Sequence, residues 1–132
     1  MTPQLEESHR LLRLAYRDRT AFEALLRAAG VDLAIACFHA QQAVEKALKA
    51  VLCLRDLEYP RTHDLEELSR RLVNDGLTPP VEDAALRRLT PYAVRFRYDD
   101  EPMHLLTGPE AEQIVEAVLA WAASFVGSGS AG

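Results

Sequence analysis

Arg97 and His104 are the two residues in this sequence whose types and spacing best fit catalytic chemistry, with six residues between them. A histidine can accept or donate a proton near neutral pH. An arginine can make a bidentate contact with a phosphate and stabilise the negative charge of a transition state. Such a pair requires no metal ion. The alternative is structural: Arg97 pairs with a nearby carboxylate, and His104 is a solvated loop residue.

The segment between these two residues is acidic. Asp99, Asp100 and Glu101 follow Tyr98 directly, and their charges would repel a phosphate group. The whole chain carries a formal net charge of −5, which argues against tight non-specific binding along a nucleic-acid backbone. A basic surface, if there is one, must therefore be small and local.

Other kinds of active site have no specific support in the sequence. The four histidines stand apart, and the chain contains no HExxH or CxxC motif, no phosphate-binding glycine loop and no nucleophile elbow. We therefore expect neither a metal site nor a cofactor.

Cys37 and Cys53 are sixteen residues apart, which is about 24 Å along a helix and too far for a disulfide. Two reduced cysteines fit a reducing compartment. No apolar run is long enough to cross a bilayer, and the N-terminus does not resemble a signal peptide. We therefore expect a cytoplasmic location and no membrane association.

A second candidate site is a polar stripe on a helix that is otherwise apolar. Gln41, Glu45 and Lys49 recur every four residues beside a face of large apolar residues, and a separate strip of this helix contains only alanine. One interpretation is a simple ion pair between Glu45 and Lys49. The other is that the stripe, with the adjacent Gln42, faces a binding cleft or a subunit interface.

His63 is open to a similar pair of interpretations. It lies between Thr62 and Asp64 at the start of a short helix, where capping of the helix explains the threonine or the aspartate. A position near a bound nucleotide is the alternative role for His63. Tyr98 joins these residues as a candidate for binding or for an interface.

The elements that must position these residues are all predicted to be helices. Helical spacing of apolar residues, capping signals and proline breaks predict helices over residues 2–29, 32–57, 64–73, 81–98 and 107–125, with a kink or a new start at Thr90–Pro91 and a loop over 99–106. If the fourth helix is continuous, Arg97 lies over its apolar stripe and Arg95 faces solvent. We expect an all-α, up-and-down bundle of four to five helices in one domain, residues 1–126, followed by a flexible tail, 127–132.

Three segments resemble HEPN domains. Phe38 with the run AQQAVEKALKA, residues 40–50, is similar to the signature helix of that family. Thr62-His63-Asp64-Leu65 with Leu68 resembles its short third helix, and Arg97-Tyr98 with the acidic residues after it resembles the end of its fourth. The resemblance covers roughly residues 10–126. It implies a helical bundle that is usually a homodimer.

The resemblance also implies two functions. Regulatory HEPN domains are nucleotide-binding, helical partners of a minimal nucleotidyltransferase in toxin–antitoxin-like pairs. Ribonuclease members cleave RNA without a metal and carry an arginine, four to six residues and then a histidine at the dimer interface, which Arg97 and His104 fit at the outer limit. Tyr98 and Leu106 depart from the ribonuclease and toxin patterns, which often have a small polar residue and a tyrosine there. We therefore favour the regulatory partner, with the metal-independent endoribonuclease as the alternative and a dimeric scaffold as a third reading.

Overall fold

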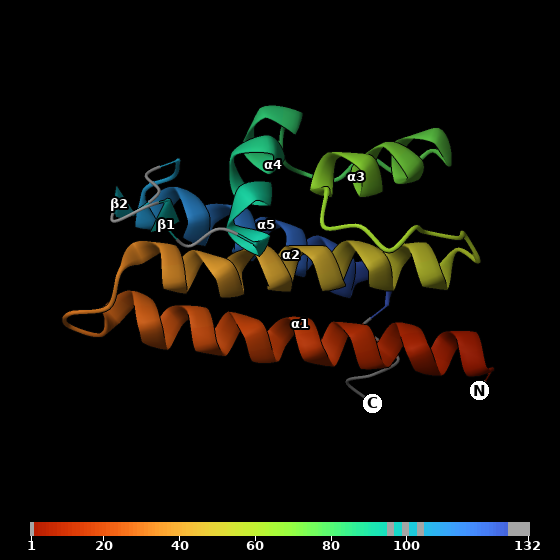
Figure 1. Cartoon of the computed structure of the whole chain (residues 1–132). Coiled ribbons are helices and arrows are strands. Elements are labelled where there is room, and N and C mark those ends of the chain that lie inside the picture. Colours follow the sequence, from red (N-terminus) through yellow and green to blue (C-terminus); the bar gives the residue numbers. More distant parts are fainter. Residues whose placement is uncertain (1, 95–96, 99–100, 103–104, 127–132) are drawn as a thin grey trace.

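The computed structural model describes residues 2–94 and 105–126, and the backbone of residues 97–98 and 101–102. The described elements are α1 (Pro3–Arg27), α2 (Leu33–Leu54), α3 (Leu65–Asn74), α4 (Asp83–Leu89), the 3-10 helix η1 (Thr90–Ala93), the two-residue strands β1 (Arg97–Tyr98) and β2 (Glu101–Pro102), and α5 (Gly108–Phe125) (Figure 1). The prediction of an all-α bundle is confirmed.

Helix α2 is the centre of the bundle. It runs beside α1 as the second arm of a helical hairpin, α5 lies behind it, and α3 and η1 cover another side (Figure 1). Its small side chains allow these close approaches, because alanine leaves room for the backbone of a neighbouring helix. Six alanines of α2 are fully buried: Ala34, Ala36, Ala40, Ala43, Ala47 and Ala50. The predicted alanine strip is therefore a packing surface.

The helix ends follow local signals in the sequence. Gly30 adopts a φ of +80° in the turn between α1 and α2, a conformation that favours glycine. The Asp64 side chain accepts hydrogen bonds from the backbone N–H groups of Glu66 and Glu67 at the start of α3. Thr107 and Glu110 form the predicted capping box at the start of α5.

The predicted interruption of the fourth helix at Thr90–Pro91 is confirmed, because a separate 3-10 helix starts at Thr90, but the predicted end near Tyr98 was wrong. Helix α4 ends at Leu89, η1 ends at Ala93, and the chain is extended at Arg97. Pro91 explains the early end, because it has no backbone N–H to donate and its ring clashes with the carbonyl one turn earlier. The hydroxyl of Thr90 also donates to the Leu86 carbonyl oxygen at 3.0 Å.

The structure also changes two related predictions, the loop over 99–106 and the choice between Arg97 and Arg95. The backbone of Arg97 pairs with that of Pro102, and Tyr98 pairs with Glu101, in an antiparallel ladder. Part of the segment predicted as a loop over 99–106 is therefore a strand. The argument that distinguished Arg97 from Arg95 needed a continuous helix, so it no longer applies.

Candidate functional site

The predicted catalytic pair can be placed only in part. Arg97 and Tyr98 lie in β1, where their backbones pair with β2. His104 lies outside the described residues, as do the side chains of Arg97 and Tyr98. The proposed roles of all three residues therefore stay predictions.

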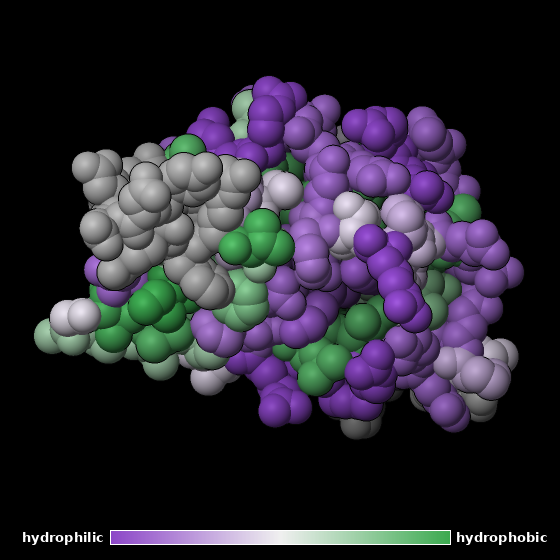
Figure 2. Space-filling view, viewed as in Figure 1, coloured by the Kyte–Doolittle hydropathy of each residue, from purple (hydrophilic) through white to green (hydrophobic). Residues whose placement is uncertain are grey.

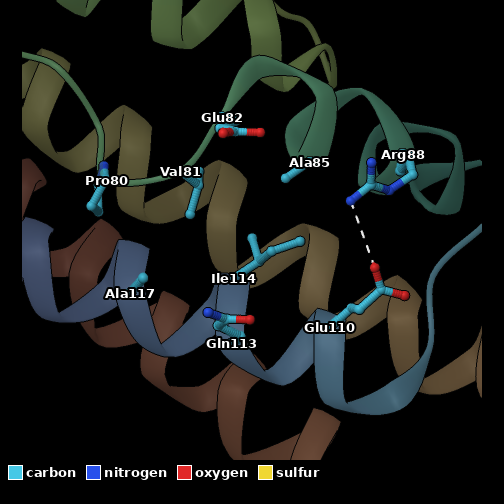
Figure 3. A pocket seen from close by; sticks show the side chains of 9 residues that line it. All are labelled: Pro80, Val81, Glu82, Ala85, Arg88, Glu110, Gln113, Ile114 and Ala117. Atoms are coloured by element: carbon cyan, nitrogen blue, oxygen red, sulfur yellow. Dashed lines mark ion pairs between the residues drawn. The ribbon is translucent and has the colours of Figure 1, made fainter.

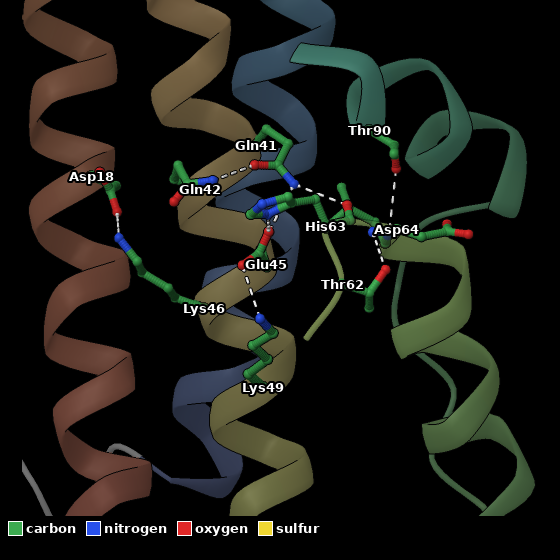
Figure 4. Close-up of polar contacts among 11 residues, drawn as sticks. Asp18, Gln41, Gln42, Glu45, Lys46, Lys49, Thr62, His63, Asp64 and Thr90 are labelled. Atoms are coloured by element: carbon green, nitrogen blue, oxygen red, sulfur yellow. Dashed lines mark hydrogen bonds and ion pairs between the residues drawn. The ribbon is translucent and has the colours of Figure 1, made fainter. Parts of the chain in front are cut away.

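The polar stripe of α2 is the core of a well-defined cluster, which we call the Glu45 cluster: Gln41, Gln42, Glu45, Lys49 and His63 (Figure 4). Glu45 is only 5% exposed. Its Oε1 atom accepts a hydrogen bond from Nε2 of Gln41 at 3.1 Å and lies 2.7 Å from Nδ1 of His63. Its Oε2 atom accepts from Nζ of Lys49 at 3.0 Å. One buried carboxylate thus holds three side chains.

Gln41 connects the helix to the loop that precedes α3. Its Nε2 atom also donates to the backbone carbonyl oxygen of His63 at 3.1 Å, and its Oε1 atom accepts from Nε2 of Gln42 at 2.7 Å. Among the described residues, every buried side-chain nitrogen or oxygen atom has a hydrogen-bond partner. The predicted Glu45–Lys49 ion pair is therefore present, as part of a buried network within the chain. A binding cleft or subunit interface at this stripe stays a prediction.

The loop holds His63 at the surface. The backbone N–H of Asp64 donates to Oγ1 of Thr62 at 3.0 Å, and that of Leu65 donates to Oγ1 of Thr90 at 3.1 Å (Figure 4). The His63 side chain is 56% exposed while its Nδ1 atom faces the buried carboxylate. An imidazole fixed in this way can contact a ligand or transfer a proton with the rest of its ring.

Tyr59 closes the other end of the Glu45 cluster. Nζ of Lys49 lies 5.5 Å from the centre of the Tyr59 ring, which suits a cation–π contact. Burial raises the pKa of the Tyr59 hydroxyl, which keeps it neutral at physiological pH. The ammonium group therefore has a carboxylate on one side and an aromatic face on the other.

A second cluster on α2 was not singled out from the sequence. Asp18 of α1 contacts both His39 and Lys46 of α2, on the opposite flank of α2 from His63 (Figure 4). A usable signal was present, because His39 and Lys46 are seven residues apart and so share a face of the helix. Asp18 lies about as far before the turn at Gly30 as these residues lie after it.

A third feature is a groove of about 280 Å³ between α4 and α5. Figure 3 shows Val81 and Ala85 on one side of it and Ile114 on the other. Arg88 and Glu110 form an ion pair at its end, 3.7 Å apart. Glu82 is the third charged residue in its lining, and Arg88 is already paired with Glu110, so the groove offers less chemistry than the clusters on α2.

Exposed apolar side chains border the segment that contains Arg97. Val94 is 69% exposed on one side of this segment, Leu105 is 41% exposed on the other, and Ile35 at the start of α2 is 42% exposed. Figure 2 shows hydrophobic surface directly beside the undescribed region. Apolar surface of this kind often marks a protein interface.

Metal binding and membrane insertion find no support in the described part of the chain. No group of three or more histidine, cysteine, aspartate or glutamate side chains there could hold a metal ion. None of the described helices is long and apolar enough to cross a membrane.

Comparison with known proteins identifies the family. Neither a curated protein nor a solved structure matches this chain significantly. The family model of the HEPN domain, however, matches residues 8–126, which is most of the sequence and includes both clusters on α2. The chain therefore belongs to the HEPN family.

Proposed function

We propose that this protein is a homodimeric, nucleotide-binding regulatory partner of a small nucleotidyltransferase, in a toxin–antitoxin-like pair. HEPN domains typically associate with such enzymes, and the described surface suits contact with protein. The observation that carries the proposal is the exposure of Val94 and Leu105 on either side of the acidic segment 99–101. Apolar and acidic groups together favour a protein partner over a polyanion such as RNA.

The Glu45 cluster also supports a binding role over a catalytic one. Its buried polar atoms are hydrogen-bonded within the chain, and Lys49 is committed to Glu45. Such a network stabilises one arrangement of α2 and the loop before α3. His63 is then the member of the cluster best placed to contact a nucleotide or a partner, because it is the most exposed of its ion-paired groups.

Co-expression with the product of the neighbouring gene tests this proposal. We expect that gene to encode a minimal nucleotidyltransferase, and we expect the two proteins to co-purify as a complex whose mass, measured by light scattering, contains two copies of this chain. Growth should be compared for cells that express each protein alone and both together. A nucleotidyltransferase neighbour that does not bind, or the absence of such a neighbour, would overturn the proposal.

A metal-independent endoribonuclease is the second candidate function. The β1–β2 ladder favours it, because pairing of Arg97 with Pro102 turns the chain back on itself two residues before His104 in the sequence. In this mechanism His104 accepts the proton of the RNA 2′-hydroxyl, whose oxygen attacks the adjacent phosphorus while the bond from phosphorus to the 5′-oxygen breaks and that oxygen takes up a proton. Arg97 stabilises the charge on the phosphorus-centred transition state.

This alternative predicts RNA cleavage in the presence of EDTA, with 2′,3′-cyclic phosphate ends. Arg97→Ala and His104→Ala should each reduce the rate by about a hundredfold or more. Arg70→Ala, which removes an exposed arginine from α3, is the matched control and should cleave at the parent rate. If His104→Ala cleaves as fast as the parent, or if the purified parent cleaves no RNA, the endoribonuclease candidate fails.

A further inference from the structure

A pocket of about 300 Å³ lies between α1 and α2, on the flank of α2 that faces away from His63. Its lining residues are Leu14, Arg17, Asp18, Ala21, His39 and Lys46. Figure 4 shows Lys46 reaching from α2 to Asp18 on α1, with His63 on the other side of α2. The volume is at the lower end of the range for small-molecule pockets, roughly 300–1,000 Å³.

Asp18 holds two side chains of this pocket in place. Nζ of Lys46 lies 2.5 Å from its Oδ2 atom, and Nδ1 of His39 lies 3.1 Å from its Oδ1 atom. Both carboxylate oxygens are therefore occupied, and the Asp18 side chain is only 14% exposed. The ammonium group keeps further hydrogens for a ligand, and the His39 ring keeps its second nitrogen.

Arg17 supplies a cation that has no partner in the described chain. It is exposed, lines the pocket, and makes no hydrogen bond or ion pair with any described residue. With Arg17 and Lys46 positive and Asp18 negative, the pocket has a net charge of +1 when His39 is neutral and +2 when it is protonated. A pocket with this charge stands out on a chain whose net charge is −5.

We propose that this pocket binds a diphosphate group, either of free inorganic pyrophosphate or of a nucleoside diphosphate. Arg17 provides a planar, bidentate donor and Lys46 a point charge, a combination that matches phosphate oxygens. His39 is a third donor. Asp18 is a positioning residue: it holds Lys46 and His39 in place, while its own negative charge would repel a phosphate.

The charge and the small extent of the pocket favour a phosphate group over a metal cation or a long nucleic acid. A metal cation would be repelled by Arg17 and Lys46. A long nucleic acid would need an extended basic surface, whereas the acidic balance of the chain leaves only a local one. The proposal deepens the proposed function, and it rests on that function only for the expectation that the phosphate belongs to a nucleotide.

Isothermal titration calorimetry with three probes tests the site: inorganic pyrophosphate, ADP and adenosine, all in EDTA. We expect one equivalent of pyrophosphate and of ADP to bind per chain, and adenosine not to bind. Lys46→Gln and Arg17→Gln should each weaken both phosphate probes at least about tenfold, because each removes a charged hydrogen bond. Arg70→Gln removes the same charge from α3 and should bind like the parent.

Each outcome bears on the proposal. Binding of pyrophosphate without ADP would assign the site to free pyrophosphate, and tighter binding of ADP than of pyrophosphate would support a nucleotide. The pocket assignment fails if neither probe binds at millimolar concentration, if adenosine binds as well as ADP, or if the two variants bind like Arg70→Gln. If Lys46→Gln loses helicity by circular dichroism, the test depends on Arg17→Gln. That variant should fold like the parent, because Arg17 makes no hydrogen bond or ion pair with the described residues.

Co-purification of the same variants with the nucleotidyltransferase keeps the two proposals distinguishable. Variants that lose pyrophosphate but still bind the enzyme confirm the pocket as a separate site. A parent chain that binds pyrophosphate but no nucleotidyltransferase would overturn the proposed function and leave the pocket assignment standing.

Discussion

Nδ1 of His63 lies 2.7 Å from Oε1 of Glu45, so a half-exposed imidazole is tied to a carboxylate that is almost completely buried. The two residues belong to different elements, the loop before α3 and the middle of α2. Their contact links the surface of the protein to its central helix, and it brings together two residues that the sequence identified separately. Any ligand that moves His63 would therefore act directly on the buried network.

Replacement of Glu45 by glutamine should destabilise the fold. The carboxylate accepts from three donors, whereas an amide offers one acceptor oxygen and turns its NH₂ group toward another donor. Lys49, 14% exposed, would lose its charged partner. We expect Glu45→Gln to lower the free energy of unfolding by about 1–3 kcal/mol, measured by urea denaturation.

The matched control is Glu116→Gln. Glu116 pairs with Arg19, but its side chain is 48% exposed, and exposed ion pairs contribute little, about 0–1 kcal/mol. Equal losses in Glu45→Gln and Glu116→Gln would show that the Glu45 cluster is not a buried network of the kind described.

The capping box of α5 gives a second stability prediction. The Oγ1 atom of Thr107 accepts a hydrogen bond from the backbone N–H of Glu110 at 3.2 Å, and Glu110 accepts one from the Thr107 N–H at 3.0 Å. Thr107→Ala should cost about 1 kcal/mol, read as a shift of the urea midpoint. Thr107→Ser keeps the hydroxyl and should retain most of the stability. A loss as large in Thr107→Ser would argue against the cap.

Much of this architecture could be predicted from the sequence, because its signals are local. The cap at Thr107 and the turn at Gly30 depend on neighbouring residues, and the alanine strip depends on a spacing that repeats along a single helix, α2. The end of the fourth helix was mispredicted at Tyr98 because an apolar stripe continues past Pro91 in the sequence, while the α-helix cannot continue there.

The site was harder to predict, since its contacts cross between elements. Periodicity placed Gln41, Glu45 and Lys49 on one stripe, but it could not show that His63 would meet them. The pocket at Asp18 was missed for the same reason: Asp18 and His39 are 21 positions apart in the sequence. Only the pairing of α1 with α2 brings them together.

Cys37 should make stability depend on pH in the alkaline range. Burial raises the pKa of its thiol from about 9.0 to about 11. Between these values the unfolded chain releases this proton while the folded chain keeps it, so the stabilisation is fully present below about pH 9 and is lost as pH rises toward 11. Unfolding free energies at intervals across this window should fall less steeply in Cys37→Ala than in the parent. Identical slopes would show that the Cys37 thiolate is tolerated in the fold.

Homodimer formation is the prediction most closely connected to function. We expect a two-fold dimer whose interface includes the surface around Arg97, and Val94 and Leu105 supply the exposed apolar area beside it. Val94→Asp would place a charge in that interface, where desolvation without a partner is costly. Light scattering at micromolar concentration should show the parent as a dimer and Val94→Asp as a monomer, with unchanged helicity.

Val73→Asp is the control for this experiment, because Val73 is 47% exposed but lies on α3, away from the segment at Arg97. It introduces the same charge on a comparably exposed valine and should leave the dimer intact. If both variants dissociate, the added charge weakens the dimer wherever it is placed, and the result gives no support to an interface at Val94. If the parent is a monomer, or if Val94→Asp remains a dimer, the contact around Arg97 is wrong. A composite catalytic site built across that contact would then be wrong with it.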